Sequence, residues 1–224
     1  MNTATPIKDA KIVKMDLNNP TKTLNAAREA ILELRKENES LQREIADLRQ
    51  FREMAYQDSL SGLMNRRAFD KDIAREMARA NRQINNAFSV MLIDLNDFKA
   101  INDERGHQVG DDVIKWVATF LKTQVRLQDV VYRLGGDEFA ILMPDTLDKG
   151  ARAVMTRIME VLHLCNMARP FPVRMSLGAS TYKVDGNTPD KLLDVADKRM
   201  YQSKKLQKAA LRRQPTPPMR RLVS

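Results

Sequence analysis

The chain has 224 residues, of which 43% are hydrophobic and 30% charged, with 38 lysines and arginines against 29 aspartates and glutamates. This balance is typical of a globular chain with some extended helix and excludes a fibrous or fully disordered protein. A single cysteine, Cys165, excludes an internal disulfide or a cysteine-based zinc site, and two histidines exclude a histidine-rich metal site. Any bound metal is therefore expected to have oxygen ligands.

The net charge of +9 is concentrated at the C-terminal end. Residues 1–53 carry ten basic and nine acidic side chains, and residues 56–203 carry 21 and 20. Residues 204–224 carry seven basic side chains and no acidic one, so the body of the protein is nearly neutral, which argues against a nucleic-acid partner. The apolar runs are too short to cross a bilayer and no signal segment opens the chain, so we expect a cytoplasmic protein without a membrane span.

The N-terminal quarter divides into two segments. Residues 1–21 show no clean hydrophobic period, so we expect a flexible segment, one that could dock an unidentified protein partner. Apolar or small residues then recur at alternating spacings of three and four, typical of heptad a and d positions: Leu24, Ala27, Ile31, Leu34, Leu41, Ile45 and Leu48. Asn38 fills the remaining core position and favours a parallel two-stranded register. Residues 22–55 are therefore predicted to form a coiled-coil helix that makes a homodimer, although a single amphipathic helix packed on its own domain is the alternative.

The remaining chain alternates between strand and helix patterns. Residues 88–96, FSVMLIDLN, predict a strand buried on both faces. The other expected elements are a helix over 65–84, a helix over 110–126, two strands joined at Gly135 and Gly136, a helix over 147–168, a strand over 173–182 and a helix over 189–205. The order βαββαβ predicts an α+β fold of the polymerase-palm or nucleotidyl-cyclase kind. Residues 209–224 are expected to be a disordered basic tail.

Three acidic residues lie at strand ends. Asp94 closes the buried strand, and Asp137 with Glu138 follows the double-glycine turn. Carboxylates brought together at strand ends are costly unless a cation neutralises them, and a small cluster of oxygen ligands suits Mg²⁺. The alternative is that these are ordinary solvated turn acids.

The segment after the buried strand, residues 96–111, is punctuated by glycines and opens a helix, so we expect a loop whose backbone N–H groups can surround phosphate. Asn102 and Asp111 offer an amide and a carboxylate that suit the edge of guanine. The alternative for Asp111 is an interaction with the helix dipole.

Four sequence motifs, taken together, resemble those of GGDEF-domain diguanylate cyclases. RLGGDEF begins at Arg133, DSLSGLMNRRAF at Asp58, LIDLNDFKAINDERGHQVGD at Leu92 and ADKRMYQSKK at Ala196. The first of these in the chain has Ser61 where threonine is usual. The resemblance implies a GGDEF domain over residues 56–208, with a mainly antiparallel central sheet, surrounding helices and the coiled-coil helix before it.

The resemblance also implies roles for single residues. Asp94 and Glu138 would bind Mg²⁺ through their carboxylates, and Leu95 would bind it through its backbone carbonyl. Two ions are expected in each half-site, with Mn²⁺ as the alternative metal. Asp137 would be a second metal ligand or the base that activates the 3′-hydroxyl, so Asp137 and Glu138 are the expected catalytic residues. The expected substrate-binding residues are Phe98 and Lys99 for the outer phosphates, Asn102, His107 and Asp111 for guanine, Gly135 and Gly136 for close backbone approach, and Lys204 and Lys208 for phosphate. The Gly-Arg-Asn triplet that the family commonly has around position 208 is absent.

The implied reaction joins two GTP molecules into cyclic di-GMP and two pyrophosphates across a dimer of domains. Arg126 and Asp129 match the family's RxxD motif for inhibition by the product, and Arg157 is a weaker candidate for a further contact. A helix-end pairing of Arg126 with Asp129 is the alternative.

Three other functions are alternatives to this reaction. The first is a catalytically silent module that binds GTP or cyclic di-GMP and signals through a partner, but the acidic and guanine-reading residues are intact. The second is an enzyme with relaxed base choice, which the carboxylate of Asp111 argues against. The third, a basic coiled-coil DNA binder, would need a basic run continuous with the coil.

Overall fold

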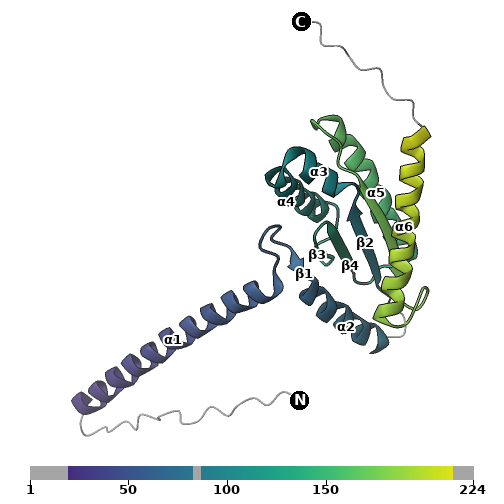
Figure 1. Cartoon of the computed structure of the whole chain (residues 1–224). Helices are drawn as coiled ribbons and strands as arrows, with labels where there is room; N and C mark the ends of the chain where they lie inside the picture. Colours follow the sequence, from purple (N-terminus) through teal and green to yellow (C-terminus); the bar gives the residue numbers. More distant parts are fainter. Residues whose placement is uncertain (1–19, 83–86, 214–224) are drawn as a thin grey trace, which may run out of the picture. The chain divides into compact units, whose positions relative to one another are not determined.

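The computed structural model describes residues 20–82 and 87–213, and the chain divides into two compact units, residues 1–53 and 54–224. Most of the first unit is helix α1, Pro20–Tyr56 (Figure 1). The apolar row along this helix stays open to solvent, since Leu34 is 64% and Leu48 61% exposed. Asn38 accepts a 2.9 Å hydrogen bond from Gln42 of the same helix. The predicted helix is confirmed, and its pairing with a second helix stays a prediction.

The second unit contains a five-stranded sheet in the order β1-β3-β4-β2-β5. Its strands are β1 (Met64–Asn65), β2 (Ser89–Leu95), β3 (Val130–Gly135), β4 (Glu138–Met143) and β5 (Met175–Thr181). Strand β2 pairs antiparallel with β4 and β5, and β3 pairs antiparallel with β4, whereas β1 runs parallel to β3. The mainly antiparallel sheet expected from the sequence is confirmed.

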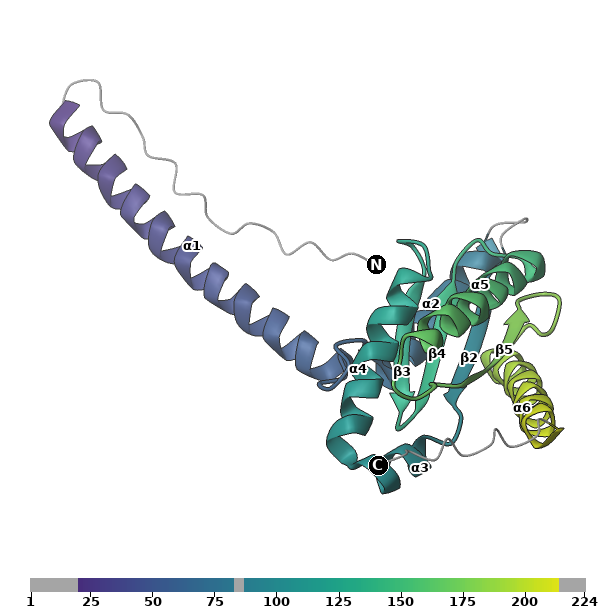
Figure 2. The same ribbon diagram turned by 90° about the horizontal axis from the view of Figure 1, so that it is seen from above.

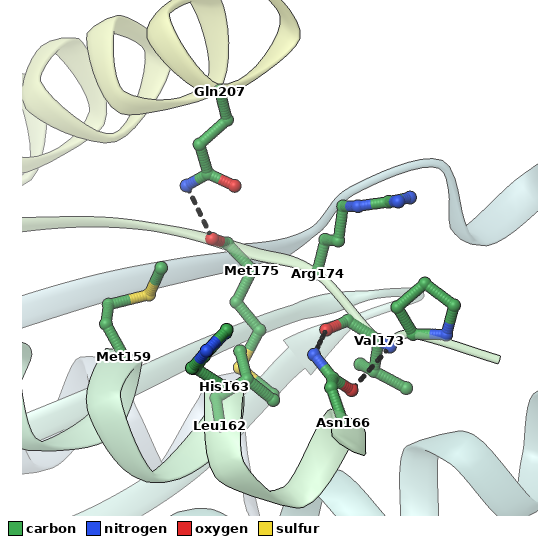
Figure 3. Close-up of a pocket in the computed structure, with 9 residues that line it drawn as sticks. Met159, Leu162, His163, Asn166, Val173, Arg174, Met175 and Gln207 are labelled. Atoms are coloured by element: carbon green, nitrogen blue, oxygen red, sulfur yellow. Dashed lines mark hydrogen bonds between the residues drawn. The ribbon is translucent and has the colours of Figure 1, made fainter. Parts of the chain in front are cut away.

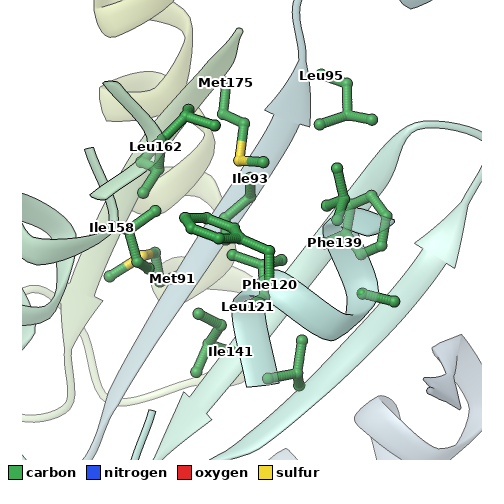
Figure 4. Close-up of a cluster of buried hydrophobic side chains, with 14 of the residues drawn as sticks. Met91, Ile93, Leu95, Phe120, Leu121, Phe139, Ile141, Ile158, Leu162 and Met175 are labelled. Atoms are coloured by element: carbon green, nitrogen blue, oxygen red, sulfur yellow. The ribbon is translucent and has the colours of Figure 1, made fainter. Parts of the chain in front are cut away.

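Helices cover both faces of this sheet (Figure 1, Figure 2). Helices α4 (His107–Thr123) and α5 (Asp148–Met167) lie on one face, with α2 (Arg66–Arg82) and α6 (Pro189–Arg213) on the other. Strand β2 alternates between the two, because Met91 and Ile93 belong to the core under α4 and α5 (Figure 4), while Val90 and Leu92 belong to the core under α2 and α6. The prediction that this strand is buried on both faces is confirmed.

One expectation was wrong in the segment after β2. We expected a loop over 96–111, but this segment forms helix α3, Phe98–Arg105, and the first turn of α4. Gly106, with a φ of 87°, separates the two helices, and Gly110 lies inside α4. Helix α3 has too few residues for a readable hydrophobic period, and its apolar side chains Phe98 and Ile101 gain their partners only from the core.

The last helix also differs from expectation, because α6 continues to Arg213 instead of ending near Lys205. Residues 206–213 hold leucine, alanine, glutamine, lysine and arginine, which are good helix formers, and no glycine or proline interrupts them. The predicted tail beyond residue 213, the N-terminal segment before residue 20 and the predicted helix end at Ile84 lie outside the described residues. No helix within the described ranges is long and apolar enough to cross a membrane.

Helix α6 approaches β5 very closely at Gly178. A Cβ atom at this position would lie 2.1 Å from the carbonyl oxygen of Ala196 and 2.2 Å from the backbone nitrogen of Met200. Both atoms belong to the backbone of α6, so no side-chain movement can relieve the clash. The absence of a side chain at Gly178 therefore sets how deeply α6 lies on the sheet.

Gly178→Ala is expected to lower the free energy of unfolding by about 1–3 kcal/mol, because the added methyl group forces α6 away from β5. Urea unfolding followed by circular dichroism measures this loss. Gly150→Ala is the matched control, because a Cβ there meets only a methyl group of Thr146, at 3.0 Å. Equal stability of Gly178→Ala and wild type would contradict the close approach.

Candidate active site

The register between β2 and β4 brings the expected metal-binding residues together. Asp94 lies directly opposite Glu138, so the two side chains point to the same face of the sheet. The next residue, Leu95, donates its backbone N–H to the carbonyl of Asp137 at 3.1 Å. The end of the buried strand and the start of β4 thus form one continuous acidic edge.

Lysines from α6 lie against this edge. The ammonium of Lys204 is 2.5 Å from Oδ1 of Asp94, and that of Lys208 is 3.7 Å from Oδ1 of Asp97. The side chain of Asp94 is only 15% exposed, so its charge needs a cation nearby. The ammonium of Lys204 supplies this positive charge. The contact also shows that a cation can reach the Asp94 carboxylate.

These residues fit a metal ion that shares its ligands with a phosphate. Within residues 20–82 and 87–213, no three acidic, histidine or cysteine side chains gather into a cluster that could hold an ion alone. The expected set instead combines the Asp94 and Glu138 carboxylates with the Leu95 carbonyl. Mg²⁺ commonly takes one or two carboxylates and completes its octahedral shell with water and substrate phosphate.

Helix α3 begins directly after the acidic edge. Its first two residues are Phe98 and Lys99, whose backbone N–H groups lie in the first turn and have no partner within the helix. Asp97 precedes them in the left-handed conformation, with a φ of 59°. A helix N-terminus of this kind favours anions, so the geometry suits the predicted phosphate role of this backbone.

The two predicted guanine-reading residues come from neighbouring helices. Asn102 of α3 lies against α4, because a Cβ at Gly110 would be only 1.8 Å from its Oδ1. Asp111 directly follows this glycine. His107, the first residue of α4, is exposed. The sequence singled out Asn102 and Asp111, but it did not reveal that Gly110 makes room for the amide.

The double-glycine turn is held by Arg133, an arginine whose role the sequence does not indicate. Gly135 and Gly136 have φ angles of 153° and 49°, which favour glycine. Arg133 donates from Nε and Nη2 to the carbonyl of Gly136, at 3.0 and 2.8 Å, and from Nη1 to Oδ1 of Asp58, at 2.9 Å. One guanidinium therefore ties this turn to the segment before β1.

The carboxylate of Asp58 is also held by Ser61. Its Oδ1 accepts hydrogen bonds from the backbone N–H of Ser61 at 2.8 Å and from the Ser61 hydroxyl at 2.6 Å. Burial alone would raise the pKa of Asp58, but these bonds and the one from Arg133 outweigh it and lower the pKa. Asp58 and Arg133 belong to two separate sequence motifs, and only the folded structure shows that their side chains contact each other.

The predicted inhibitory motif forms a tight turn. The backbone N–H of Arg126 donates to Oδ2 of Asp129, and the backbone N–H of Asp129 donates to the carbonyl of Arg126, both at 3.0 Å. Within the described parts of the chain, the guanidinium of Arg126 pairs with no carboxylate. Both residues line an open groove of about 540 Å³, together with Lys122 and Leu127.

Asp129 and Arg157 differ in their relation to this groove. Asp129 is 8% exposed and its Oδ1 has no hydrogen-bond partner among the described residues. Burial raises the pKa of Asp129, against the opposing effect of the Arg126 N–H and of the charges on Arg126 and Arg157. Arg157 donates to the carbonyl of Gln124 and does not line the groove. The structure thus brings Arg126 and Asp129 together and leaves Arg157 to one side.

The family model described as "Diguanylate cyclase, GGDEF domain" matches residues 55–210. The response regulator PleD of Caulobacter vibrioides is 37% identical over 161 residues, which are 68% of this chain and 34% of PleD. The probable diguanylate cyclase DgcT of Escherichia coli is 32% identical over 162 residues, which are 70% of this chain and 35% of DgcT. The chain thus spans about a third of the length of these relatives.

Solved structures show the same fold. The coiled coil and GGDEF domain of DgcB from Caulobacter crescentus, in complex with c-di-GMP, matches with a TM-score of 0.68 and 26% identity over 79% of this chain and 94% of that one. The GGDEF domain of PA1120 from Pseudomonas aeruginosa matches with a TM-score of 0.62 and 33% identity, over 67% of this chain and 89% of that one. Both neighbours are GGDEF domains.

Gly110→Ala is expected to weaken binding of GTP about tenfold, since the new methyl group displaces the Asn102 amide and removes roughly one hydrogen bond to the base. Titration calorimetry measures the affinity. Gln108→Ala, at an exposed position of the same helix, should bind as wild type does. If Gly110→Ala keeps its affinity, Asn102 does not contact the base.

Proposed function

The chain belongs to the GGDEF domain family of diguanylate cyclases, and we propose that it condenses two molecules of GTP into cyclic di-GMP and two pyrophosphates. The observation that carries this proposal is the pairing of Asp94 with Glu138 beside the N-terminus of α3. The acidic edge suits a divalent ion, and the helix N-terminus suits the phosphates that the ion would bridge.

Each residue of the site would act mainly by positioning the nucleotide. Asn102 and Asp111 would bind the guanine edge, and the backbone of Phe98 and Lys99 would receive the outer phosphates. Lys204 would leave Asp94 and turn to a phosphate oxygen when the ion binds. Bound Mg²⁺ would neutralise charge on the attacking and leaving oxygens. Asp137 or Glu138 would then accept the proton of the 3′-hydroxyl.

A second copy of the chain is needed because each domain holds one GTP. The 3′-hydroxyl on one domain must attack the α-phosphate held by the other, so two domains have to face each other. We propose that residues 22–55 pair as a parallel coiled coil and that residues 56–208 form the cyclase domain. The exposed apolar row of α1 supports this pairing, because a partner helix would cover it.

We also propose that cyclic di-GMP inhibits the enzyme at the groove containing Arg126 and Asp129. The guanidinium of Arg126 can offer a planar fork of donors to a phosphate or to guanine. Asp129, whose Oδ2 accepts the backbone N–H of Arg126, would hold the turn that presents this guanidinium to the groove. The c-di-GMP complex of DgcB, a structural neighbour, agrees with a domain that binds this dinucleotide.

Incubation of the purified chain with GTP and Mg²⁺, followed by chromatography of the nucleotides, tests the activity. Glu138→Gln is expected to lower turnover by roughly 100-fold or more, since it removes a charge that acts on the reacting phosphates. Glu160→Gln, at an exposed position of α5, should leave turnover unchanged. The specific activity should rise with enzyme concentration until the dimer is saturated.

Absence of cyclic di-GMP from wild type at concentrations where light scattering finds a dimer would contradict the cyclase. GTP or cyclic di-GMP binding without turnover would then favour the silent module that signals through a partner. Formation of a mixed guanine-adenine product in the presence of ATP would instead overturn the guanine selectivity assigned to Asp111.

Arg126→Ala is expected to raise the cyclic di-GMP concentration needed for half-inhibition about tenfold, because a charge-assisted hydrogen bond to the dinucleotide is lost. The measurement is the initial rate of pyrophosphate release against added cyclic di-GMP. Arg152→Ala, which removes an exposed arginine paired with Asp148, is the control. An unchanged dependence of the initial rate on cyclic di-GMP in Arg126→Ala would contradict inhibition at this groove.

A further inference from the structure

One face of α6 contacts the end of β2 and the turn that follows it at three successive points. Gln207 and Lys208 follow Lys204 by three and four residues, so all three side chains lie toward this face. Lys204 reaches Asp94 and Lys208 reaches Asp97, as described above. Between them, Oε1 of Gln207 accepts a 3.0 Å hydrogen bond from Nδ2 of Asn96.

The Gly-Arg-Asn triplet that the family commonly has around position 208 is absent from this chain. A glycine near the end of a helix commonly stops it, and Gln207 stands where the glycine of that triplet would be. Glutamine instead lets the helix run on to Arg213. The change therefore adds a side chain with one donor and one acceptor group beside the proposed metal and phosphate site.

Both polar atoms of the Asn96 side-chain amide are hydrogen-bonded. Asn96 is 6% exposed, its Oδ1 accepts a 2.8 Å hydrogen bond from the hydroxyl of Ser176, and its Nδ2 donates to Gln207. Gln207 in turn donates from Nε2 to the carbonyl of Met175 at 2.8 Å (Figure 3). The chain of hydrogen bonds fixes the orientation of both amides, and it joins α6, β5 and the turn after β2.

Packing alone does not hold Gln207 in place. Its side chain borders a cavity of about 280 Å³ lined by Met159, Leu162 and Met175 among others (Figure 3). Open space on this side leaves the glutamine free to rotate away if its hydrogen bonds are lost. Its position therefore depends on its hydrogen bonds, which join it to Asn96, to Met175 and, at 3.3 Å, to the hydroxyl of Ser203.

We infer that Gln207 is a positioning residue for the metal- and phosphate-binding turn, acting through Asn96. Asn96 lies between Leu95, whose carbonyl is an expected metal ligand, and Asp97, which directly precedes α3. A shift of Asn96 would displace both the carbonyl and the first N–H groups of α3. This inference rests on the proposed function, because it assigns to Gln207 the support of that same site. Residues that hold a metal ligand in place commonly change metal affinity when they are replaced.

Four variants test the inference: Gln207→Leu, Asn96→Ala, the double variant, and Gln202→Leu as the matched control. Gln202 lies on the same helix, is exposed and makes no hydrogen bond within the described residues. The probe is Mn²⁺ with 3′-deoxy-GTP, which lacks the attacking hydroxyl and so binds without turnover. Calorimetry measures its affinity, and thermal unfolding checks that each variant is folded.

Gln207→Leu is expected to bind the probe about tenfold more weakly than wild type, whereas Gln202→Leu binds as wild type. If Gln207 acts through Asn96, the double variant binds no more weakly than Asn96→Ala alone. Wild-type affinity in Gln207→Leu, or losses that simply add in the double variant, would overturn the inference.

Hydrogen exchange of the chain without nucleotide gives a second readout that does not depend on the proposed function. The backbone amides of residues 95–99 should exchange faster in Gln207→Leu than in Gln202→Leu, with exchange in the rest of the sheet unchanged. Equal exchange of this segment in the two variants would overturn the inference even if the wild type binds no nucleotide. Failure of the wild type to bind the probe, with faster exchange in Gln207→Leu, would count against the proposed function alone.

Discussion

Two carboxylates meet at one edge of the sheet, and much of the surrounding structure serves to keep them there. The register of β2 against β4 places Asp94 opposite Glu138 on the same face. Like charges directly opposite each other in an antiparallel pair are destabilising. A cation close by offsets this repulsion. In the structure Lys204 contacts Asp94, and the proposed reaction would bring a metal ion to the same place.

The rigidity of this edge comes from the way the sheet is buried. Strand β2 has a hydrophobic core on each of its faces, and a slip of one residue would exchange the side chains between the two cores. Such a slip would bury Asp94 in the core that now holds Leu95. The register that stabilises the fold is therefore the same register that aligns the proposed metal ligands.

Three separate supports hold the residues proposed to contact substrate beside this edge. Arg133 ties the double-glycine turn to Asp58, Gly110 gives Asn102 room against α4, and α6 reaches the turn after β2 through Lys204, Gln207 and Lys208. The last support depends on the close approach of α6 to β5 at Gly178. A helix held further from the sheet would carry all three side chains away from the acidic edge.

The sequence by itself determined most of the helices and strands, the burial of β2 on both faces, the turn at Gly135 and Gly136, and the choice of residues proposed to bind metal and guanine. These follow from local patterns, because side-chain periodicity and turn chemistry act over a few residues. The sequence did not reveal helix α3, the length of α6 or the roles of Arg133, Gly110 and Gln207. The roles of Arg133 and Gln207 depend on contacts between segments far apart in the chain. Arg133 contacts Asp58, and Gln207 contacts Asn96, which the packing of α6 on β5 brings to a hydrogen-bond distance of 3.0 Å. Contacts of this kind leave no recognisable pattern in the sequence of either segment, because they depend on the fold that brings the two residues together.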